Sequence, residues 1–312
     1  MDGRIQVFAG NSNPKLVEAI TAELELPLGR ALVGTWKDGE TRVELEENVR
    51  GSDIFVVQSL CAPVNQNVME LLLMLDAVKR SSAARVTAVI PYYAYARQEK
   101  KTRGREPISA KLVANLLTTA GADRVLTLDL HAPAIEGFFD IPVDHLRATP
   151  ILAGHYRKLR YDDLVVVSPD SGGVGRADEF RQRAGGSLAI ISKKHPGPEQ
   201  TQVLEMVGDV EGRHAVIVDD MISTGETLVK AAETLLSRGA RSVQAVAVHG
   251  VFAGRALDLI DASPIEKISV TDSVPLPDSA RGERIEVLTV APLLAEAIMR
   301  IHKDLSISAL FT

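Results

Sequence analysis

Two adjacent carboxylates followed by a hydroxyl-rich turn form the most informative segment of the chain. Residues 215–230 read AVIVDDMISTGETLVK, so Asp219 and Asp220 follow an apolar run. Backbone amides that open a helix after such a turn bind phosphate. The acid pair repels phosphate but accepts hydrogen bonds from vicinal hydroxyls, which predicts a cradle for a sugar diol and its phosphate. The cradle consists of Asp219, Asp220, Ser223, Thr224, Gly225, Glu226 and Thr227.

The simplest alternative is an Asp-Asp helix cap with Ser and Thr filling the turn. A second segment, residues 91–107 (PYYAYARQEKKTRGREP), concentrates five cations in a chain whose net charge is −6. These cations could hold nucleotide phosphates or could form a solvated basic loop. Together with the tyrosines they could also bind single-stranded nucleic acid. The acidic net charge and the absence of a second basic stretch argue against that reading.

The remaining chemistry-bearing residues lie after other apolar runs. His131 follows one run in the string DLH, and Asp170 follows another in SPD. An imidazole and a carboxylate at neighbouring strand ends could hold a metal, but Mg²⁺ prefers oxygen ligands. From the residues alone, a core or hydrogen-bonded role for His131 is therefore favoured.

Short β-branched runs alternate with helical patterns, and the runs are nearly continuously apolar. Such runs are typical of parallel strands covered on both faces, so an α/β fold is predicted. The predicted strands are residues 5–8, 54–58, 86–90, 125–128, 164–167, 188–191, 215–218, 243–248 and 268–270. The predicted helices are residues 14–24, 64–80, 109–120, 149–159, 225–238 and 292–302.

An internal repeat predicts two similar domains. Residues 112–131 and 230–249 each read as a helix, a Gly-Ala stop, a strand and a His. Two unrelated αβ units could resemble each other in the same way. If the repeat is real, the domains are 1–147 and 148–312. Cys61 is the only cysteine and no apolar run could span a membrane, so we expect a cytoplasmic protein.

The turn after Asp220 resembles the ribose-5-phosphate loop of type I phosphoribosyltransferases. The resemblance extends over almost the whole chain to the ribose-phosphate pyrophosphokinase (PRPP synthetase) family. It implies two phosphoribosyltransferase-like domains, each a mostly parallel sheet flanked by helices. The matching strings are FAGNSNPKL, KDGE, VNQNVMELLLMLDAVKRSSAARVTAVIPYYAYARQEKK, REPISAKLVANLL, DLHAPAIEGFFDIPVDHL, SPDSGG and VDDMISTGET.

The resemblance implies a reaction and its participants. ATP would donate its β,γ-diphosphoryl group to the C1 hydroxyl of ribose 5-phosphate, giving AMP and PRPP with the help of Mg²⁺. It also implies a homo-oligomer, commonly a hexamer built from dimers, and no nucleic-acid or membrane partner. Phosphoryl-type transfer depends mainly on positioning and charge neutralisation, so cations rather than a side-chain nucleophile are expected.

The same resemblance assigns site residues. It implies ATP contacts for Trp36, Asp38, Glu40, Arg97, Gln98 and Glu99, the first three reaching a neighbouring subunit, although Trp36 could instead be ordinary core. It implies Mg²⁺ ligation by His131 and Asp170, and a catalytic loop with Lys193, Lys194 and His195. It implies an allosteric anion site with Arg50, Ser82, Ser306, Ser308 and Phe311.

Five positions depart from the family pattern, one of which is Ser223 in place of the more common Asp, a change that should help bind phosphate. His195 stands where the family has Arg, and we predict that Lys194 compensates for the lost cation. Glu226 stands where the family has Gly, so its carboxylate must point away from phosphate. Asn48 replaces a usual Ser and Glu136 a usual Gln, from which we expect weak activation by phosphate.

These departures leave two alternatives to an active diphosphokinase. One is a catalytically silent relative that regulates a true synthetase. The other is a phosphoribosyltransferase that consumes PRPP, although such proteins usually need only one domain of this kind. Retention of the acid pair, His131, Asp170 and Lys193 favours the active enzyme.

Overall fold

The chain folds into two compact units. The structure is a computed structural model that describes residues 3–194, 203–280 and 284–310. The first unit contains the chain up to residue 147, residues 273–275 and the segment from residue 289 onward. The second contains residues 148–272 and 276–288. Among the described residues, no helix combines the length and the apolar character needed to cross a membrane.

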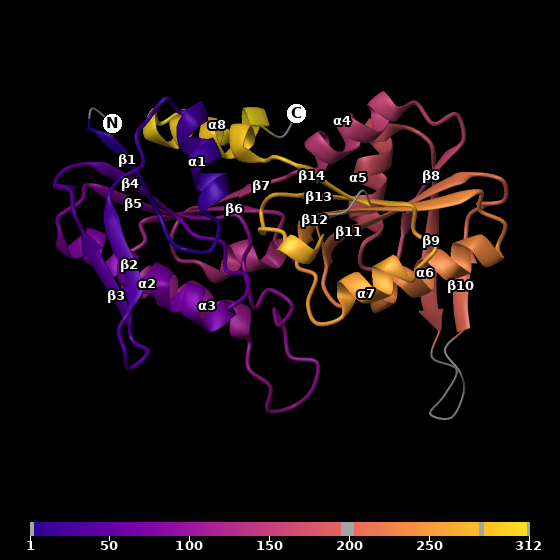
Figure 1. The fold of residues 1–312 in the computed structure, drawn as a ribbon, viewed down its shortest axis with the longest axis horizontal. Coiled ribbons are helices and arrows are strands. Elements are labelled where there is room, and N and C mark those ends of the chain that lie inside the picture. The colour runs from indigo at the N-terminus through magenta and orange to yellow at the C-terminus, as the bar shows by residue number, and fades with distance from the viewer. Residues whose placement is uncertain (1–2, 195–202, 281–283, 311–312) are drawn as a thin grey trace. The chain divides into compact units, whose positions relative to one another are not determined.

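The first unit is built on a parallel five-stranded sheet covered by helices on both faces. The strand order is β1-β4-β5-β6-β7. The strands are β1 (Ile5–Ala9), β4 (Asp53–Val57), β5 (Arg85–Ile90), β6 (Arg124–Leu128) and β7 (Val143–Leu146). Figure 1 shows one face covered by α1 (Pro14–Glu23) and α8 (Ala291–His302) and the other by α2 (Val64–Arg80) and α3 (Ser109–Ala120). A short 3₁₀ helix (Pro133–Phe138) precedes β7, and another (Ile307–Leu310) follows α8.

A separate hairpin extends from this unit. Strands β2 (Ala31–Thr35) and β3 (Thr41–Leu45) pair only with each other, in antiparallel register. Figure 1 shows them projecting away from the five-stranded sheet. The residues between them form the tip of the hairpin.

The second unit has a seven-stranded sheet in the order β10-β9-β8-β11-β12-β13-β14. All neighbours are parallel except β9 and β10. The strands are β8 (Leu164–Ser168), β9 (Ser187–Lys194), β10 (Val203–Val207), β11 (His214–Ile222), β12 (Ser242–Gly250), β13 (Lys267–Thr271) and β14 (Ile285–Leu288). The helices are α4 (Thr149–Leu159), α5 (Val174–Ala184), α6 (Glu226–Ser237) and α7 (Ala256–Asp261), with a 3₁₀ turn at Asp278–Ala280.

The predicted α/β class is confirmed, and its cause is visible in the strands. Every residue of β4, β8 and β12 is buried, as expected for parallel strands covered on both faces. All nine predicted strands and all six predicted helices are present, with small differences at their ends. Strands β2, β3, β7, β10 and β14 and helices α5 and α7 were not predicted, because their residues are mixed rather than continuously apolar.

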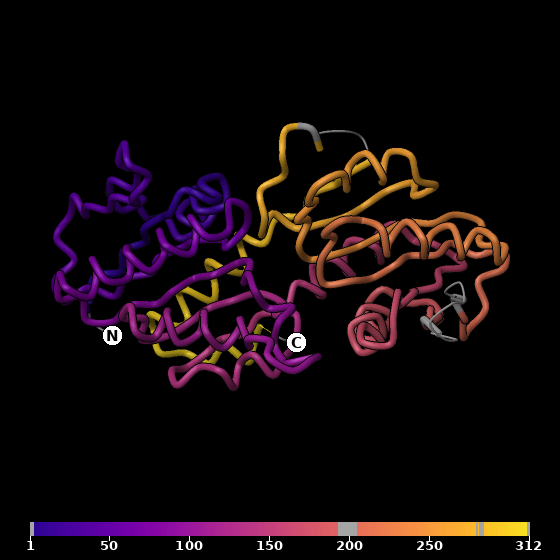
Figure 2. Tube along the Cα trace, turned by 90° about the horizontal axis from the view of Figure 1, so that it is seen from below, coloured from indigo at the N-terminus to yellow at the C-terminus, as the bar shows by residue number. Residues whose placement is uncertain are grey.

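The C-terminal segment differs from the predicted domain division. We assigned residues 148–312 to one domain, but α8 packs against α1 of the first unit. Arg85 pairs with buried Asp53 at 2.6 Å and with Asp304 at 3.1 Å, which ties the end of α8 to two strands. Figure 2 shows the yellow C-terminal trace among the indigo and magenta segments of this unit. These contacts join residues too distant in sequence for local patterns to reveal.

The predicted repeat corresponds to two similar helix–strand units. Helices α3 and α6 are each followed by a Gly with positive φ, +113° at Gly121 and +85° at Gly239, and then by β6 and β12. Glycine adopts this conformation without a Cβ penalty, which explains the shared stop. The two His residues differ, however, since His131 is exposed and His249 is buried.

Candidate active site

The acid pair lies inside β11 rather than after it. The strand continues through Asp219 and Asp220 to Ile222 and pairs with β12 along that length. Its pairing with β8 on the other side ends at Ile217 and Val167. Both carboxylates therefore lie beyond the end of β8, at the carboxyl-terminal edge of the sheet. Ligands of open α/β sheets bind at this edge.

One guanidinium serves both carboxylates. Arg176 Nη1 lies 3.2 Å from Asp219 Oδ1 and 3.5 Å from Asp220 Oδ1. Burial and the neighbouring charge of Asp220 raise the pKa of Asp219 to about 8, while Arg176 acts in the opposite direction. Ionisation of both acids would leave more negative than positive charge beside Arg176, so the second ionisation is disfavoured until a hydroxyl donor or a further cation binds.

Sequence reasoning missed Arg176. It lies on α5, which was not predicted, and it follows Asp170 only after a glycine-rich turn. Its role emerges only when β8 and β11 become neighbours. No local pattern distinguishes it from Arg181 or Arg183 on the same helix.

The turn after the acid pair is held from one side by the chain after β12. Ile222 O accepts from the amides of Val251 and Phe252, and Ser223 O accepts from Ala253 N at 3.0 Å. Gly225 has a φ of +79° and is the N-cap of α6, which starts at Glu226. The first amides of a helix have no intrahelical acceptor, so this turn presents N–H groups to an anion.

The cradle side chains reach solvent from this turn. Thr224, Glu226 and Thr227 are exposed and Ser223 is half-buried. The structure thus brings together all seven residues predicted for the cradle on one β11–turn–α6 element. The boundaries of this element differ from the prediction, because β11 is longer than predicted and α6 starts one residue later.

Removal of the Glu226 side chain is expected to preserve or improve ribose 5-phosphate binding. A carboxylate at the first helical position is attracted to the same amides that would hold phosphate. We expect Glu226→Gly to lower the KM for ribose 5-phosphate up to about fivefold and to cost about 0.5–1 kcal/mol of stability. Steady-state kinetics and thermal unfolding measure the two effects. Glu233→Gly on the exposed side of α6 is the control, and a large rise in KM for Glu226→Gly alone would assign Glu226 an active role.

Asp170 shapes the turn between β8 and α5. Its Oδ1 accepts from the amides of Gly172 and Gly173, both at 2.9 Å, and Ser168 Oγ donates to its carbonyl oxygen. Its Oδ2 has no partner in the described part of the chain. One oxygen thus holds the turn and the other is available to a ligand.

His131 is exposed after β6, so the alternative of a core histidine is wrong. His131 belongs to the first unit and Asp170 to the second, and each is described within its own unit. In residues 3–194, 203–280 and 284–310, no three His, Cys, Asp or Glu side chains gather into a metal site.

A second histidine fixes the turn that carries His131. The amide of Leu130 donates to His145 Nε2 at 2.8 Å, so the ring proton lies on Nδ1 and is donated to Glu136. Burial, aided by Arg147, lowers the pKa of His145, which keeps the ring neutral and able to accept. His145 thereby links β7 to the end of β6. Sequence reasoning did not identify this role.

The predicted allosteric residues lie at the opposite edge of the first sheet, where the strands begin. Gly51 N donates to Ser82 O at 2.9 Å, which places Arg50 beside Ser82. The Arg85–Asp304 pair brings the chain after α8 to the same edge, and Arg300 binds the carbonyl of Ser306 at 2.9 Å. Ser308 N donates to Ser306 Oγ at 3.2 Å, and Phe311 lies outside the described residues.

Glu136 is not part of this group. It lies with His145 at the carboxyl-terminal edge of the sheet, whereas Arg50 precedes the start of β4. Within one chain, Glu136 is therefore not a carboxylate that could repel an anion from Arg50. Glu136 could face the anion site only from a neighbouring subunit, so weak phosphate activation stays a prediction.

The hairpin tip carries Trp36, Asp38 and Glu40. Trp36 N donates to Glu40 O at 2.7 Å and Gly39 N to Trp36 O at 3.0 Å, with Gly39 at a φ of +97°. Trp36 is 51% exposed, so the core alternative is wrong. The Arg42 guanidinium lies 4.7 Å from its ring centroid. An exposed indole on a rigid turn can stack on a planar ligand.

The basic loop follows β5 and is partly ordered by its own acids. Arg97 and Gln98 are exposed, and Glu99 pairs with Lys100 at 2.8 Å. Gln98 is anchored to α3, since its carbonyl accepts from Ala110 N and its side chain accepts from Ser109 Oγ. Arg97 has no carboxylate partner among the described residues, so its charge remains available to an anion.

The predicted catalytic lysines end β9. The backbones of Lys193 and Lys194 pair with Leu204 and Val203 of β10. His195 lies outside the described residues. The structure therefore locates the backbone of two of the three predicted catalytic residues.

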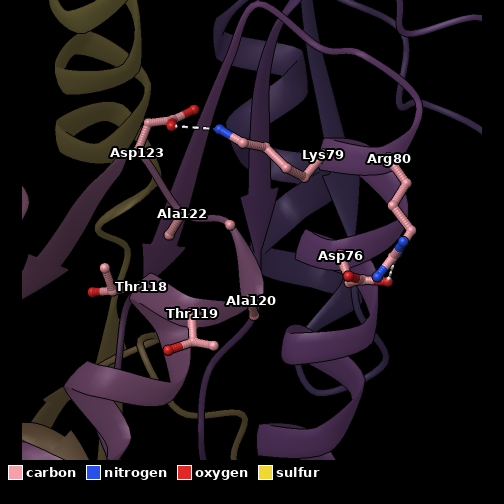
Figure 3. A pocket seen from close by; sticks show the side chains of 9 residues that line it. Asp76, Lys79, Arg80, Thr118, Thr119, Ala120, Ala122 and Asp123 are labelled. Carbon is pink, nitrogen blue, oxygen red and sulfur yellow. Dashed lines mark hydrogen bonds and ion pairs between the residues drawn. The ribbon is translucent and has the colours of Figure 1, made fainter.

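A pocket of about 400 Å³ lies elsewhere in the first unit, at the C-terminal ends of α2 and α3. Figure 3 shows its cations already paired, Lys79 with Asp123 and Arg80 with Asp76, both at 2.7 Å. Its lining therefore offers no unpaired charge for a phosphate. The pocket is also distant in the fold from the carboxyl-terminal edge of the sheet, because α2 and α3 lead into the first residues of β5 and β6.

The comparisons with known proteins agree with these features. Residues 5–121 match the family model of the N-terminal domain of ribose phosphate pyrophosphokinase, and residues 189–312 match that of the phosphoribosyl synthetase-associated domain. The crystal structure of phosphoribosylpyrophosphate synthetase from Mycobacterium smegmatis superposes with a TM-score of 0.91 at 43% identity, covering 96% of this chain and 99% of that one. The fold and site thus define a phosphoribosyl synthetase type of protein.

Relatives known by sequence make the family explicit. The ribose-phosphate pyrophosphokinase of Caldanaerobacter subterraneus is 53% identical over 309 residues, covering 99% of this chain and 98% of the relative. That of Chromobacterium violaceum is also 53% identical, covering 98% and 94%. The chain belongs to the ribose-phosphate pyrophosphokinase family, which is a family of enzymes.

Proposed function

We propose that the protein transfers the β,γ-diphosphoryl group of ATP to the C1 hydroxyl of ribose 5-phosphate, forming AMP and PRPP. The observation that carries this proposal is the juxtaposition of the Asp219–Asp220 pair with the open helix N-terminus at Gly225. A pentose phosphate offers hydroxyls to the first and a dianion to the second. Family membership supports the assignment.

Each remaining segment has a role in this reaction. The exposed guanidinium of Arg97 would contact the ATP phosphates, with Gln98 and Glu99 beside it. Trp36 would stack on adenine, and Asp38 and Glu40 would bind its polar edge, in the site of a neighbouring subunit. Lys193, Lys194 and His195 would supply positive charge to the transferring group. This arrangement requires a homo-oligomer, which we propose is a hexamer in the cytoplasm.

Mg²⁺ suits the charge of the second unit. Asp170 has one carboxylate oxygen outside its turn, and the acid pair, once both carboxylates are ionised, carries more charge than Arg176 offsets. When bound, Mg²⁺ would neutralise phosphate charge and orient ATP. Asp170 would hold it by carboxylate oxygen, and His131 would contribute an exposed imidazole from the first unit.

Formation of AMP from ATP is the measurement that tests this function. We expect AMP to appear only when ribose 5-phosphate and Mg²⁺ are both present, with equimolar PRPP. A silent regulatory relative would form no AMP even when both substrates and Mg²⁺ are present. A transferase that consumes PRPP would release diphosphate from PRPP and a base, without ATP. Either result would replace the proposal.

A further inference from the structure

A buried carboxylate outside the proposed ligand contacts organises the carboxyl-terminal edge of the first sheet. Glu70, on α2, is 1% exposed. Its Oε2 accepts from Gln58 Nε2 at 2.9 Å and Asn11 N at 3.2 Å, and its Oε1 accepts from Asn11 Nδ2 at 3.1 Å and Gln66 Nε2 at 3.4 Å. No cation among the described residues pairs with it. Amide donors alone offset the cost of burying this charge.

Neighbouring groups fix the orientation of both principal donors. Gln58 Oε1 accepts from Ser12 N at 3.0 Å, so its nitrogen must face Glu70. Asn11 Nδ2 also donates to the carbonyl of Val33 at 3.1 Å, and a carbonyl can only accept. Gly10 makes room for this arrangement, because a Cβ there would lie 2.4 Å from Gln58 Oε1.

The shared amide of Asn11 connects the buried acid to the hairpin. Val33 is in β2, three residues before Trp36. We propose that Glu70 is a positioning residue of the nucleotide site, holding the Trp36 hairpin at its angle to the sheet through Asn11. This inference rests on the proposed function, in which the hairpin tip binds adenine.

The isosteric change Glu70→Gln would place a hydrogen-bond donor opposite another donor and so disturb the contact between Asn11 and Val33. An amide at position 70 must place its NH₂ toward one of the two donor pairs. The amide oxygen of the new side chain would accept from Asn11 N and Gln58 Nε2, because a backbone N–H can only donate and the Gln58 amide is fixed by Ser12 N. The NH₂ then faces Asn11 Nδ2, and relief requires Asn11 to turn its oxygen toward Val33 O. Both outcomes weaken the contact between Asn11 and β2.

The test compares three full-length variants with the parent protein. We expect Glu70→Gln and Asn11→Ala each to accelerate hydrogen exchange of residues 31–45 about fivefold, the equivalent of one hydrogen bond. The tie is only partial because Glu47 also holds the hairpin base, accepting from Arg30 and Gln6. The KM for ATP should rise by a similar factor and the KM for ribose 5-phosphate should not change. Asp76→Asn, which changes a half-buried acid on the same helix that pairs with Arg80 and does not contact the hairpin link, is the control.

The outcomes separate the inference from the function beneath it. Trp36 is the only tryptophan, so its fluorescence anisotropy reports hairpin motion directly and should fall in both variants. A loss of thermal stability in Glu70→Gln with unchanged exchange and anisotropy at residues 31–45 would overturn the positioning role. Faster exchange with an unchanged KM for ATP, together with an unchanged KM in Trp36→Ala, would instead remove the hairpin from the nucleotide site.

Discussion

Asp219→Asn is expected to stabilise the ligand-free protein while lowering kcat/KM for ribose 5-phosphate about 10- to 100-fold. The activity loss follows from replacing a carboxyl group, whose ionised form accepts sugar hydroxyls through either oxygen, by an amide with a single acceptor oxygen, which costs about 1.5–3 kcal/mol. The stability gain follows from relieving the repulsion between two carboxylates that share Arg176. Opposite signs for activity and stability are typical of a binding site.

The stability gain should depend on pH in a defined direction. The pKa of Asp219 is raised from about 3.8 in the unfolded chain to about 8 in the fold, chiefly by burial and by Asp220. The contribution of protonated Asp219 to folding stability is thus fully present below the unfolded pKa. It is lost progressively as pH rises from there through the folded pKa. The advantage of the Asn variant should grow from pH 4 to pH 8 and then level off. Because Asp219 is partly exposed, we expect about 1–2 kcal/mol, or several degrees in Tm.

Thermal unfolding at pH 5 and pH 8, together with the AMP assay, measures both effects. Asp209→Asn changes an exposed acid of the same unit and should alter neither quantity. A variant that loses stability equally at both pH values would show that the acid pair is not under electrostatic strain.

Lys193→Ala is expected to lower kcat about 10²- to 10³-fold with little change in either KM. A cation that contacts the transferring group acts mainly in the transition state, and one such donor is worth about 3–4 kcal/mol. The backbone of Lys193 is held in the β9–β10 ladder, so the substitution should leave the sheet intact. Single-turnover kinetics with saturating substrates measure the loss.

The neighbouring residues test how the chain compensates for His195. If Lys194 supplies the missing charge, Lys194→Ala should lower kcat about 10²-fold and His195→Arg should change it little. If Lys194 has no such role, Lys194→Ala will be nearly neutral. In that event His195→Arg should raise turnover, and parental kcat should fall as pH rises through the pKa of a histidine.

Most of the scaffold was predictable because parallel strands are buried on both faces and therefore read as apolar runs. Strands β4 and β12 have every residue buried, and their sequences identify them without further information. The hairpin strands β2 and β3 are only half-buried and carry Arg42 and Glu44, so the same criterion does not detect them. The hairpin tip was nevertheless identified from its family-like residues.

The candidate site was predictable where its residues are consecutive and hidden where they are not. The cradle is one β11–turn–α6 element, so its sequence contains the whole arrangement. Arg176, His145 and Glu70 act across strands or helices, through partners 9 to 59 residues away in sequence. Their roles depend on strand order and register, which periodicity does not encode.

The return of α8 to the first unit has a consequence for biosynthesis. As the chain emerges from the ribosome, the N-terminal sheet forms with the apolar surface of α1 uncovered, because its partner helix α8 follows the second unit in the chain. Leu294, Ile298 and Ile301, which are buried on α8, become available only after the whole second unit has been synthesised. The first unit is thus synthesised first but acquires its last helix only after the second unit. A chain terminated near residue 288 would lack α8 and leave the surface of α1 uncovered.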